Sequence, residues 1–295
     1  NMVRVYRKNK RTTPHIAKGY YREKAKYDGR YVMYTESIGY VIFSGSKAPG
    51  NDYLFFGENT RKSDSKPDWT KFSGVGMDGT SLSDVDPNSA DALNEVISVE
   101  NFGLLSGKNW QSFSFHLDST YYVNRDKRYG ISFTKGLIKG SIQALADSYQ
   151  VVNIRYFSKP VYSVRSKKRV IGDEDIRFIY VGKTPFIDQA SYHFKDENLE
   201  YWNEYHLLIQ KTDNFTCNHN EYWPLLWFGV IPFVDYQPES WDLYDIPQDR
   251  DYPVIAEQLS TSSKTLEEQF AGHSGKWWLS DYLNLAPDKN IKSFM

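Results

Sequence analysis

Short stretches rich in β-branched and aromatic residues recur along this 295-residue chain, and several alternate between apolar and polar positions. Alternation with a period of two predicts strands that bury one face of a sheet. The clearest cases are residues 112–117 (SFSFHL) and residues 149–157 (YQVVNIRYF). Further strands are expected at residues 30–43, 53–57, 129–133, 161–164, 176–181, 205–210 and 225–234.

Helical patterns are fewer. Residues 86–101 place a proline in the first turn and follow it with an apolar stripe, which predicts a helix. Shorter helices fit residues 138–145 and 261–270. A tight turn is expected at Asp28-Gly29, and the stretch 58–87, with its glycines and prolines, is typical of a long exposed loop.

Roughly ten strands, few helices and connections of unequal length favour an all-β fold. We expect an antiparallel β-sandwich of the jelly-roll type, with long loops and a few short helices. No repeat with a period of 20–50 residues is present, which argues against propellers and solenoids.

Charge is distributed unevenly along the chain. The first thirty residues contain ten Lys and Arg but only two Asp and Glu, whereas the other 265 residues contain 26 Lys and Arg and 35 Asp and Glu. A segment with a net charge of about +8 therefore precedes a remainder with a net charge of about −9. We therefore expect a basic arm at residues 1–30, a sandwich body at 31–258, and a tail at 259–295 that packs on the body or on a neighbouring subunit.

The predicted arm is the candidate nucleic-acid site, because cations interleaved with tyrosines suit the neutralisation of phosphates. A frayed basic terminus without a partner is the simpler interpretation. The side chains assigned to nucleic-acid binding are Arg4, Arg7, Lys8, Lys10, Arg11, Lys18, Arg22, Lys24 and Lys26.

Cysteine usage and hydropathy narrow the class of protein. The single cysteine, Cys217, excludes an internal disulfide framework. No apolar run approaches the roughly 18–20 residues of a membrane-spanning helix. The beginning of the sequence is charged and lacks the apolar core of a signal peptide, so a soluble protein of a reducing compartment is expected.

Acidic residues cluster between residues 239 and 251, where only Arg250 offsets them. Several carboxylates delivered by one loop suit Ca²⁺, which takes about six to eight oxygen ligands. A solvated acidic loop, or a partner for the basic arm, is the alternative interpretation. The candidate metal ligands are Asp242, Asp245, Asp249 and Asp251, and no other cofactor is expected.

No motif assigns a catalytic residue. Residues 74–79 carry three glycines but fit neither a dinucleotide fingerprint nor a phosphate-binding loop. The spacing of Cys217 and His219 is poor for a nucleophile and base, and no nucleophile elbow is present. We therefore predict that the protein is not an enzyme.

Aromatic residues are abundant, with 23 Tyr, 17 Phe and 8 Trp, and they support two alternative functions. A carbohydrate-binding or carbohydrate-active β-sandwich would present tryptophans to sugars. A single-strand nucleic-acid-binding protein would combine the basic arm with tyrosines on which bases stack. The candidate sugar platforms are Trp110, Trp202, Trp223, Trp227, Trp277 and Trp278.

Residues 146–160 (ADSYQVVNIRYFSKP) resemble a segment of the single jelly-roll capsid proteins of small single-stranded DNA viruses, the densovirus-like and circovirus-like groups. In those proteins a tyrosine leads into an alternating strand that ends near a proline. Residues 3–22 are similar in role to their genome-facing termini, without the long arginine runs of circoviruses. The acidic loop after Gln237 and the tail after Leu259 have no counterpart there.

The resemblance implies a structural coat protein. Identical subunits would assemble into a small T=1 icosahedral shell, with the basic arm facing encapsidated DNA and the loops facing a host receptor. The protein would be located in the virion, and in the host nucleus or cytoplasm during assembly. Neither a membrane span nor a catalytic residue is required for this function.

Overall fold

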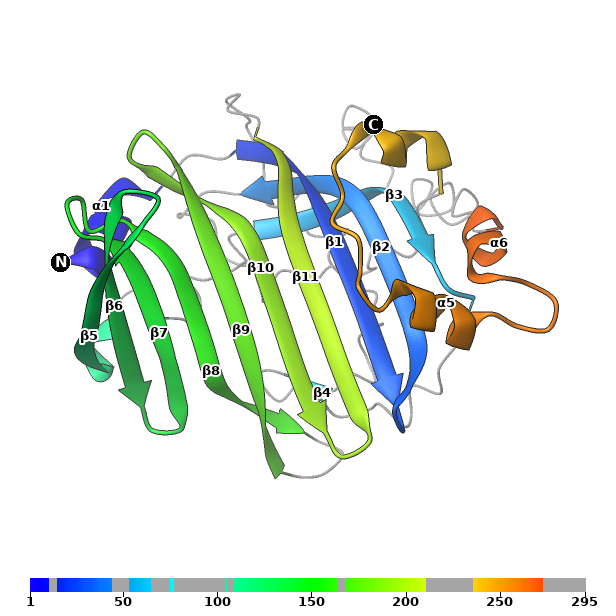
Figure 1. The fold of residues 1–295 in the computed structure, drawn as a ribbon, viewed down its shortest axis with the longest axis horizontal. Coiled ribbons are helices and arrows are strands. Elements are labelled where there is room, and N and C mark those ends of the chain that lie inside the picture. Colours follow the sequence, from blue (N-terminus) through cyan, green and yellow to red (C-terminus); the bar gives the residue numbers. More distant parts are fainter. Residues whose placement is uncertain are drawn as a thin grey trace, which may run out of the picture.

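The computed structural model describes residues 1–10, 15–43, 53–64, 75–76, 104–105, 109–163, 168–210 and 236–272. Within these ranges the chain forms one antiparallel sheet of eleven strands (Figure 1). Ten of the strands follow the order β3-β2-β1-β11-β10-β9-β8-β7-β6-β5, and β4 pairs with the end of β8. The strands are β1 (His15–Tyr27), β2 (Arg30–Phe43), β3 (Tyr53–Lys62), β4 (Val75–Gly76), β5 (Ser114–Val123), β6 (Asp126–Lys135), β7 (Ile138–Leu145), β8 (Val151–Ser163), β9 (Lys168–Val181), β10 (Thr184–Asp196) and β11 (Leu199–Gln210).

The all-β antiparallel class is confirmed, but the jelly-roll arrangement is wrong. A jelly roll packs two sheets face to face through long crossing connections. Here β5 to β11 pair in chain order, and β11 then pairs with β1. This order arises because tight hairpin turns join consecutive strands, so that each strand pairs with the next one in the chain. At the predicted turn Asp28-Gly29, both residues have positive φ (49° and 77°), as the turns that suit twisted hairpins require.

Helices are few and short among the described residues. The helices are α1 (Met2–Asn9), the 3₁₀ turns η1 (Asn109–Ser112) and η3 (Pro238–Leu243), α5 (Tyr252–Leu259) and α6 (Leu266–Ala271). Helix α6 confirms a helix within 261–270 and starts at a capping box formed by Thr265 and Glu268. None of these helices has the length and apolar character needed to cross a membrane.

Other local predictions have mixed outcomes. The predicted helix at 138–145 is wrong: these residues form β7, because Gly140, Ile142 and Ala144 are buried with a period of two. The loop predicted at 58–87 is wrong for residues 58–62, which belong to β3, and for residues 75–76, which form β4; most of the rest of that stretch lies outside the described residues. The helix predicted at 86–101 and the strand predicted at 225–234 lie outside the described residues.

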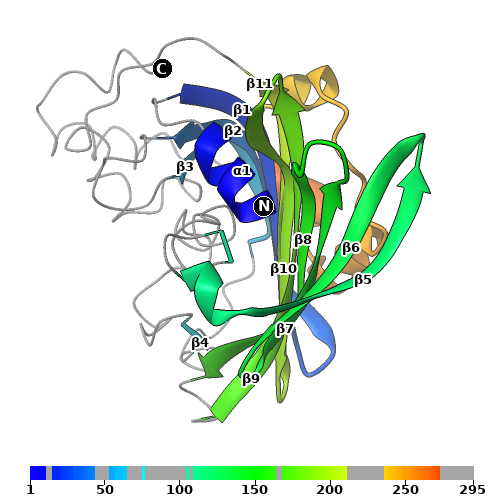
Figure 2. The same ribbon diagram turned by 90° about the vertical axis from the view of Figure 1, so that its left-hand side faces the viewer.

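The sheet has two differently covered faces (Figure 2). Helix α1 lies on one of them, which we call the back face, and packs there through Val3 and Tyr6. Tyr6 meets the ring of Phe178 edge-on at 5.7 Å. The back face is the apolar core of the molecule. Its buried residues include Tyr21, Ala25, Met33, Ile142, Ile154, Ile176, Ala190, Phe194 and Tyr205.

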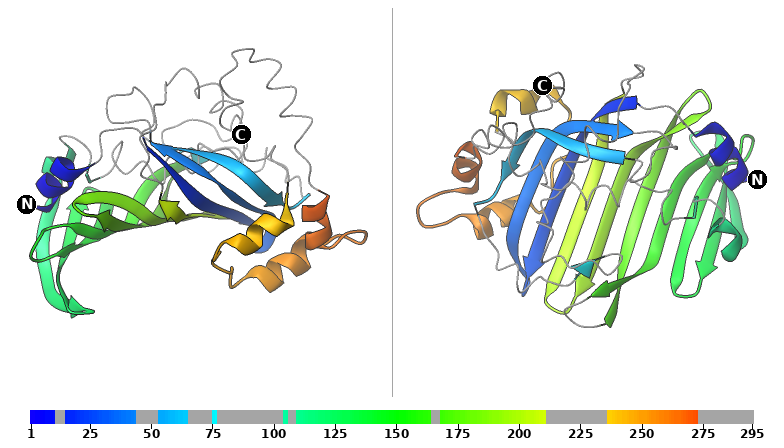
Figure 3. Two further views of the ribbon diagram at one scale, coloured as in Figure 1. Left: turned by 90° about the horizontal axis from the view of Figure 1, so that it is seen from above. Right: turned by 180° about the vertical axis from the view of Figure 1, so that it is seen from behind.

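The opposite face, which we call the front face, is covered over β1, β2 and β3 by residues 236–272, which we call the strap (Figure 3). Helix α5 packs on β2, and α6 packs on β3. Two apolar clusters hold the strap to the sheet. One contains Tyr31, Tyr34, Ile255, Leu259, Leu266 and Phe270, and the other contains Tyr20, Ile38 and Trp241. The boundary predicted between residues 258 and 259 falls inside this unit.

Most of the predicted basic arm belongs to the sheet. Strand β1 pairs with β2 on one side and with β11 on the other, so it is an interior strand. Its side chains alternate. Tyr21 and Ala25 point to the apolar back face, and Arg22 and Lys24 point to the front face. Residues 15–27 are therefore part of the folded body and not a free tether.

Replacing Gly140 by alanine is expected to destabilise the protein by about 1–3 kcal/mol. A Cβ atom at this position of β7 would lie 2.3 Å from the backbone oxygen of Arg155 and 2.3 Å from the Phe133 ring. Urea unfolding measures the change, with Ser141→Ala on the other face of the same strand as control. A Gly140→Ala protein as stable as Ser141→Ala would contradict the close packing of Phe133 over β7.

Candidate functional site

One row of front-face side chains is polar on all ten strands of the main path. The register places Glu36 beside Arg61 and Arg22, and Arg22 beside Glu204. Directly paired residues of antiparallel strands share a face, so the row runs straight across the sheet. Beyond Glu204 its members are Ser191, Asp175, Arg155, Ser141, Ser132 and His116.

The strap buries the charged end of this row. Glu36 is 1% exposed, and its carboxylate accepts hydrogen bonds from Arg22 Nε at 3.0 Å, from Arg61 and from the Tyr20 hydroxyl. Arg22 also donates to Glu204. Each buried charge thus has a partner of opposite charge, which offsets the cost of removing it from water.

Lys24 fixes the position of the strap. Its ammonium group donates to both carboxylate oxygens of Asp249 at 2.9 Å and to Asp251 at 3.1 Å. Asp249 also accepts a bond from the backbone N–H of Asp251 at 2.9 Å. A guanidinium N–H of Arg22 donates to the carbonyl oxygen of Pro247. The segment 247–251 is therefore held rigidly over β1.

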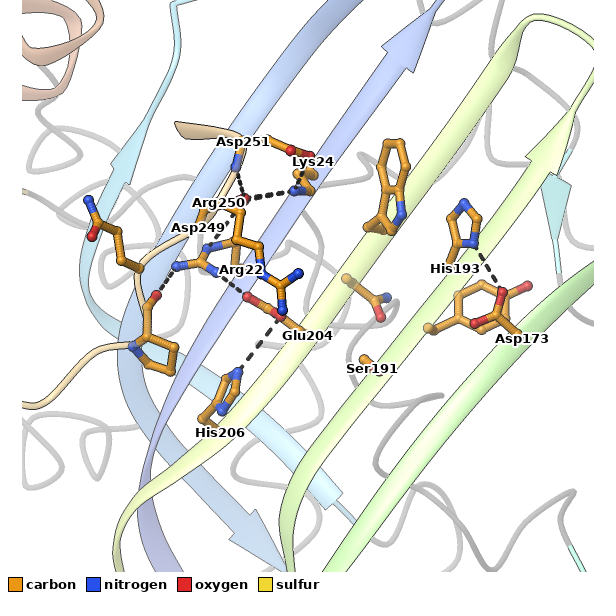
Figure 4. Close-up of a pocket in the computed structure, with 15 residues that line it drawn as sticks. Arg22, Lys24, Asp173, Ser191, His193, Glu204, His206, Asp249, Arg250 and Asp251 are labelled. Carbon is orange, nitrogen blue, oxygen red and sulfur yellow. Dashed lines mark hydrogen bonds and ion pairs between the residues drawn. The ribbon is translucent and has the colours of Figure 1, made fainter. Parts of the chain in front are cut away.

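A pocket of about 550 Å³ opens where the strap ends and the uncovered sheet begins (Figure 4). Strands β1, β11, β10 and β9 form its floor, and residues 247–251 form one wall. Pockets of about 300–1,000 Å³ accept small ligands, so this pocket has a suitable size. It is lined mainly by charged and polar side chains, in contrast to the apolar back face.

His193 and Trp202 form one side of the pocket. Their rings are stacked, with centres 4.9 Å apart and planes 11° apart. Both ring nitrogens of His193 contact carboxylates: Nδ1 lies 3.0 Å from Asp173, and Nε2 lies 3.1 Å from Glu200. The Lys24 ammonium lies 5.5 Å from the centre of the Trp202 ring. Both rings are therefore held in place by their neighbours.

Two of the paired carboxylates, Glu36 and Asp251, have pKa values below the ordinary value. Burial alone would raise the pKa of Glu36, but the charges of Arg61 and Arg22, together with the hydroxyl groups of Tyr20 and Tyr34, leave this pKa below its ordinary value. The hydrogen bond from the Tyr31 hydroxyl is the main cause that lowers the pKa of Asp251, against a smaller opposing effect of burial. Both groups are thus held in the charged form by the fold.

The free energy of unfolding is expected to fall as the pH drops below about 4. Glu36 and Asp251 have lower pKa values in the folded protein than in the unfolded chain. They stabilise the fold above the unfolded-state pKa, and this contribution is lost as the pH falls through the folded-state values. Urea unfolding between about pH 7 and pH 3 measures the effect. Asp251→Asn should lose less stability than the wild type over this range, and an equal loss would argue against a role for Asp251.

The structure divides the residues assigned to nucleic-acid binding between the two faces. Arg4, Arg7 and Lys8 are exposed on α1, which packs on the back face. The assigned residues on β1 are Lys18, Arg22, Lys24 and Lys26, and they point to the front face, where Lys18 is buried near the Tyr244 ring and Lys24 pairs with the strap. Arg11 lies outside the described residues. The assigned cations therefore do not form one surface.

The candidate calcium ligands are not brought to one point. Asp249 and Asp251 pair with Lys24, as the alternative interpretation of the acidic loop proposed, whereas Asp242 and Asp245 are exposed. Among the described residues, no group of three or more His, Cys, Asp or Glu side chains is placed to hold a metal ion.

The pocket residues His193, Ser191 and Asp173 were not predicted from the sequence. For Ser191 and His193 the local signal is the alternation in β10, where the buried ring of Tyr192 separates them; Asp173 lies on β9, between the buried neighbours Gly172 and Glu174. This pattern indicates a strand face but does not indicate that the face is a site.

No protein-family model matches the sequence, and no curated protein matches it either. Solved structures with some likeness include a DUF1329 family protein from Desulfovibrio piger, with 7% identity, a TM-score of 0.32, and coverage of 74% of this chain and 95% of that chain. An outer membrane lipoprotein-sorting protein domain from Vibrio parahaemolyticus has 9% identity and a TM-score of 0.33, and the match covers 77% of this chain and 100% of that chain. A LolA superfamily protein from Nitrosomonas europaea has 8% identity and a TM-score of 0.28, and the match covers 74% of this chain and 97% of that chain. Likenesses at these TM-scores carry no argument for the function of this chain.

The resemblance to viral capsid proteins is wrong. The described strands form one antiparallel sheet in which β5 to β11 follow chain order, in place of the two facing sheets of a jelly roll. The expectations that followed from the resemblance fall with it. These are the coat function, the shell of identical subunits, the encapsidated nucleic acid, the host receptor, and the location in a virion or in a host nucleus or cytoplasm.

The two alternative functions are also not supported. A single-strand nucleic-acid binder needs accessible cations on β1, but Lys18 and Arg22 are buried, Lys24 pairs with the strap, and Lys26 lies over the rings of Tyr31 and Trp202. Among the candidate sugar platforms, Trp202 stacks on His193, and Trp110 packs against the apolar core. The other four tryptophans of that set lie outside the described residues.

Proposed function

We propose that this protein is a non-catalytic binding protein that holds a small polar ligand in the front pocket. The observation that carries the proposal is the contrast within the pocket wall. Arg22 pairs with Glu204 and Lys24 pairs with Asp249, whereas Ser191 and Arg250 are exposed and have no side-chain partner among the described residues. A rigid frame with a few unoccupied polar groups is the usual form of a ligand site.

The same geometry favours binding over catalysis. General-base activation of a hydroxyl needs a ring nitrogen that is free to accept its proton. Both nitrogens of His193 contact carboxylates, and no hydrogen bond joins His193 to Ser191 among the described contacts. His193 therefore serves as part of the pocket wall. The charged lining also favours a polar ligand over an acyl chain.

Ligand-observed NMR with a panel of amino acids, short peptides, amines and carboxylic acids tests this proposal. Ser191→Trp fills the pocket, and Ser141→Trp introduces the same ring in the same polar row, outside the pocket. Compounds that bind the wild type and Ser141→Trp, but not Ser191→Trp, are the expected result. If no compound in the panel distinguishes Ser191→Trp from the wild type, the proposal is overturned.

A further inference from the structure

Strand β5 forms an open edge of the sheet (Figure 1). It pairs with β6 on one side and with no described strand on the other, so backbone N–H and C=O groups point outward along it. Natural edge strands are usually short, covered or interrupted by charges, because an open edge pairs readily with other extended chains. β5 is ten residues long, and eight of them are exposed. Its outer edge is therefore a candidate interaction surface.

The apolar back face reaches this edge without being closed. Leu117 pairs with Ile131, which packs against the apolar core, yet Leu117 is 56% exposed. Tyr122 pairs with Lys127, four residues before Ile131, so Tyr122 shares the face of Leu117. The Tyr122 side chain is 70% exposed. An apolar stripe of the back face is thus open to solvent along the edge strand.

One irregularity divides the edge. The register shifts at Asp118, between Leu117 and Ser119, which indicates a β-bulge. Because a bulge breaks the alternation of outward-pointing groups, two copies of β5 cannot pair in one register along their whole length. Beyond the bulge, residues 119–123 pair with β6 without a further shift. This stretch is long enough to pair with a short extended segment.

Positive charge is concentrated at this end of the sheet. Residues 114–139 contain five Lys and Arg but two Asp, a net charge of +3, whereas the whole chain has a net charge of −1. Arg125, Lys127 and Lys139 are exposed and form no ion pair with a described residue. Even the strand of Lys139, β7, lies only about 10 Å from β5, so these charges act at the edge at moderate ionic strength. A second copy would bring the same charge and be repelled, whereas an acidic segment is attracted.

We infer that the outer edge of β5 binds an extended acidic segment of another protein, which adds to the sheet as a further strand. Backbone hydrogen bonds to residues 119–123 supply affinity, and apolar side chains at alternate positions of the segment cover Leu117 and Tyr122. Acidic side chains at the other positions complement the positive charge of residues 114–139. This surface is separate from the front pocket, since β6, β7 and β8 lie between β5 and β9.

Fluorescence anisotropy with a labelled heptapeptide of alternating Glu and Val tests the inference. Two matched probes carry Lys in place of every Glu, or Pro in place of the central Val. The Glu–Val peptide should bind at least about tenfold more tightly than either probe, because Lys reverses the attraction and Pro removes a backbone donor. Hydrogen exchange should show added protection of N–H groups within residues 119–123 when the Glu–Val peptide is bound.

A pair of protein variants locates the contact. Leu117→Glu should bind the Glu–Val peptide at least about tenfold more weakly than Leu137→Glu. Leu137 is 58% exposed in the turn between β6 and β7, so it matches Leu117 in exposure but lies off the edge strand. Both changes add one negative charge, and the difference between them therefore reports the contact at the edge. Ser191→Trp in the front pocket should bind the peptide as the wild type does.

Four results would overturn the inference. The Lys–Val or the proline probe binds as tightly as the Glu–Val peptide, or Leu117→Glu and Leu137→Glu bind it equally. Ser191→Trp abolishes the binding, which would place the peptide in the front pocket. The wild type is a dimer by light scattering and Leu117→Glu is a monomer, which would assign the edge to a second copy of the chain. The absence of any peptide binding also overturns it and leaves the proposed pocket function untouched.

Discussion

Replacing Glu36 by glutamine is expected to lower the free energy of unfolding by about 3–5 kcal/mol. The carboxylate is buried, and it neutralises the guanidinium groups of Arg22 and Arg61. Glutamine keeps the size of the side chain but removes its charge, so two cations would remain close together beneath the strap. The loss of one member of a buried ion pair is among the costliest single changes, because the partner stays desolvated.

Urea unfolding followed by circular dichroism measures this effect. Glu257→Gln is the matched control, since Glu257 is exposed on α5 and forms no ion pair with a described residue. Adding Arg61→Met to Glu36→Gln should recover part of the loss, because Arg61 has no other ion-pair partner among the described residues, whereas Arg22 keeps Glu204. A Glu36→Gln protein within about 1 kcal/mol of the wild type would show that the network contributes little.

Truncation of Phe270 to alanine is expected to cost about 3–5 kcal/mol and to loosen the strap. The ring is fully buried, stacks on Tyr34 at 6.3 Å and meets Tyr236 edge-on at 6.2 Å. Guanidinium carbon Cζ of Arg61 lies 5.3 Å from its centre. Alanine would leave a cavity between α6 and the sheet, and the strap would lose a fully buried apolar anchor.

Two measurements separate the loss of global stability from the loosening of the strap. Urea unfolding reports the global change, and limited proteolysis reports cleavage within residues 236–272 under native conditions. Leu243→Ala on the same strap is the control, because that side chain is 75% exposed. Unchanged proteolysis of Phe270→Ala would mean that polar contacts such as Lys24 with Asp249 suffice to hold the strap.

The strand content was predictable because strand signals are local. β-branched and aromatic residues at alternate positions favour the extended backbone wherever they occur. Residues 30–43 form β2 over the predicted range, and the predicted strand at 176–181 forms the end of β9. The turn at Asp28-Gly29 was predictable for the same reason, since both residue types tolerate positive φ.

The basic arm was misinterpreted because a run of cations usually indicates a solvated segment. One signal pointed the other way: Arg22, Lys24 and Lys26 alternate with Glu23 and Ala25, as expected for a strand with two unlike faces. The partners that make burial of these cations tolerable are distant in sequence. Arg22 and Glu204 are 182 residues apart, and Lys24 and Asp249 are 225 residues apart.

The jelly roll was predicted from the number of strands and their unequal connections, and neither determines how strands are arranged. Ten strands can form two facing sheets or one long sheet. The choice depends on what covers each apolar face. Here α1 covers part of the back face, and the strap covers the front face of β1 to β3, so the described strands form a single sheet.

The amino-acid sequence by itself determined the β-rich class, the position of most strands, the first hairpin turn and a helix near residue 266, because each depends on preferences of neighbouring residues. Only the tertiary structure decided that the arm is an interior strand and that the acidic loop pairs with Lys24. It alone placed Arg250 and Asp173 around one pocket. These features depend on distances through space between remote segments, and charge pairing and burial are decided by such distances.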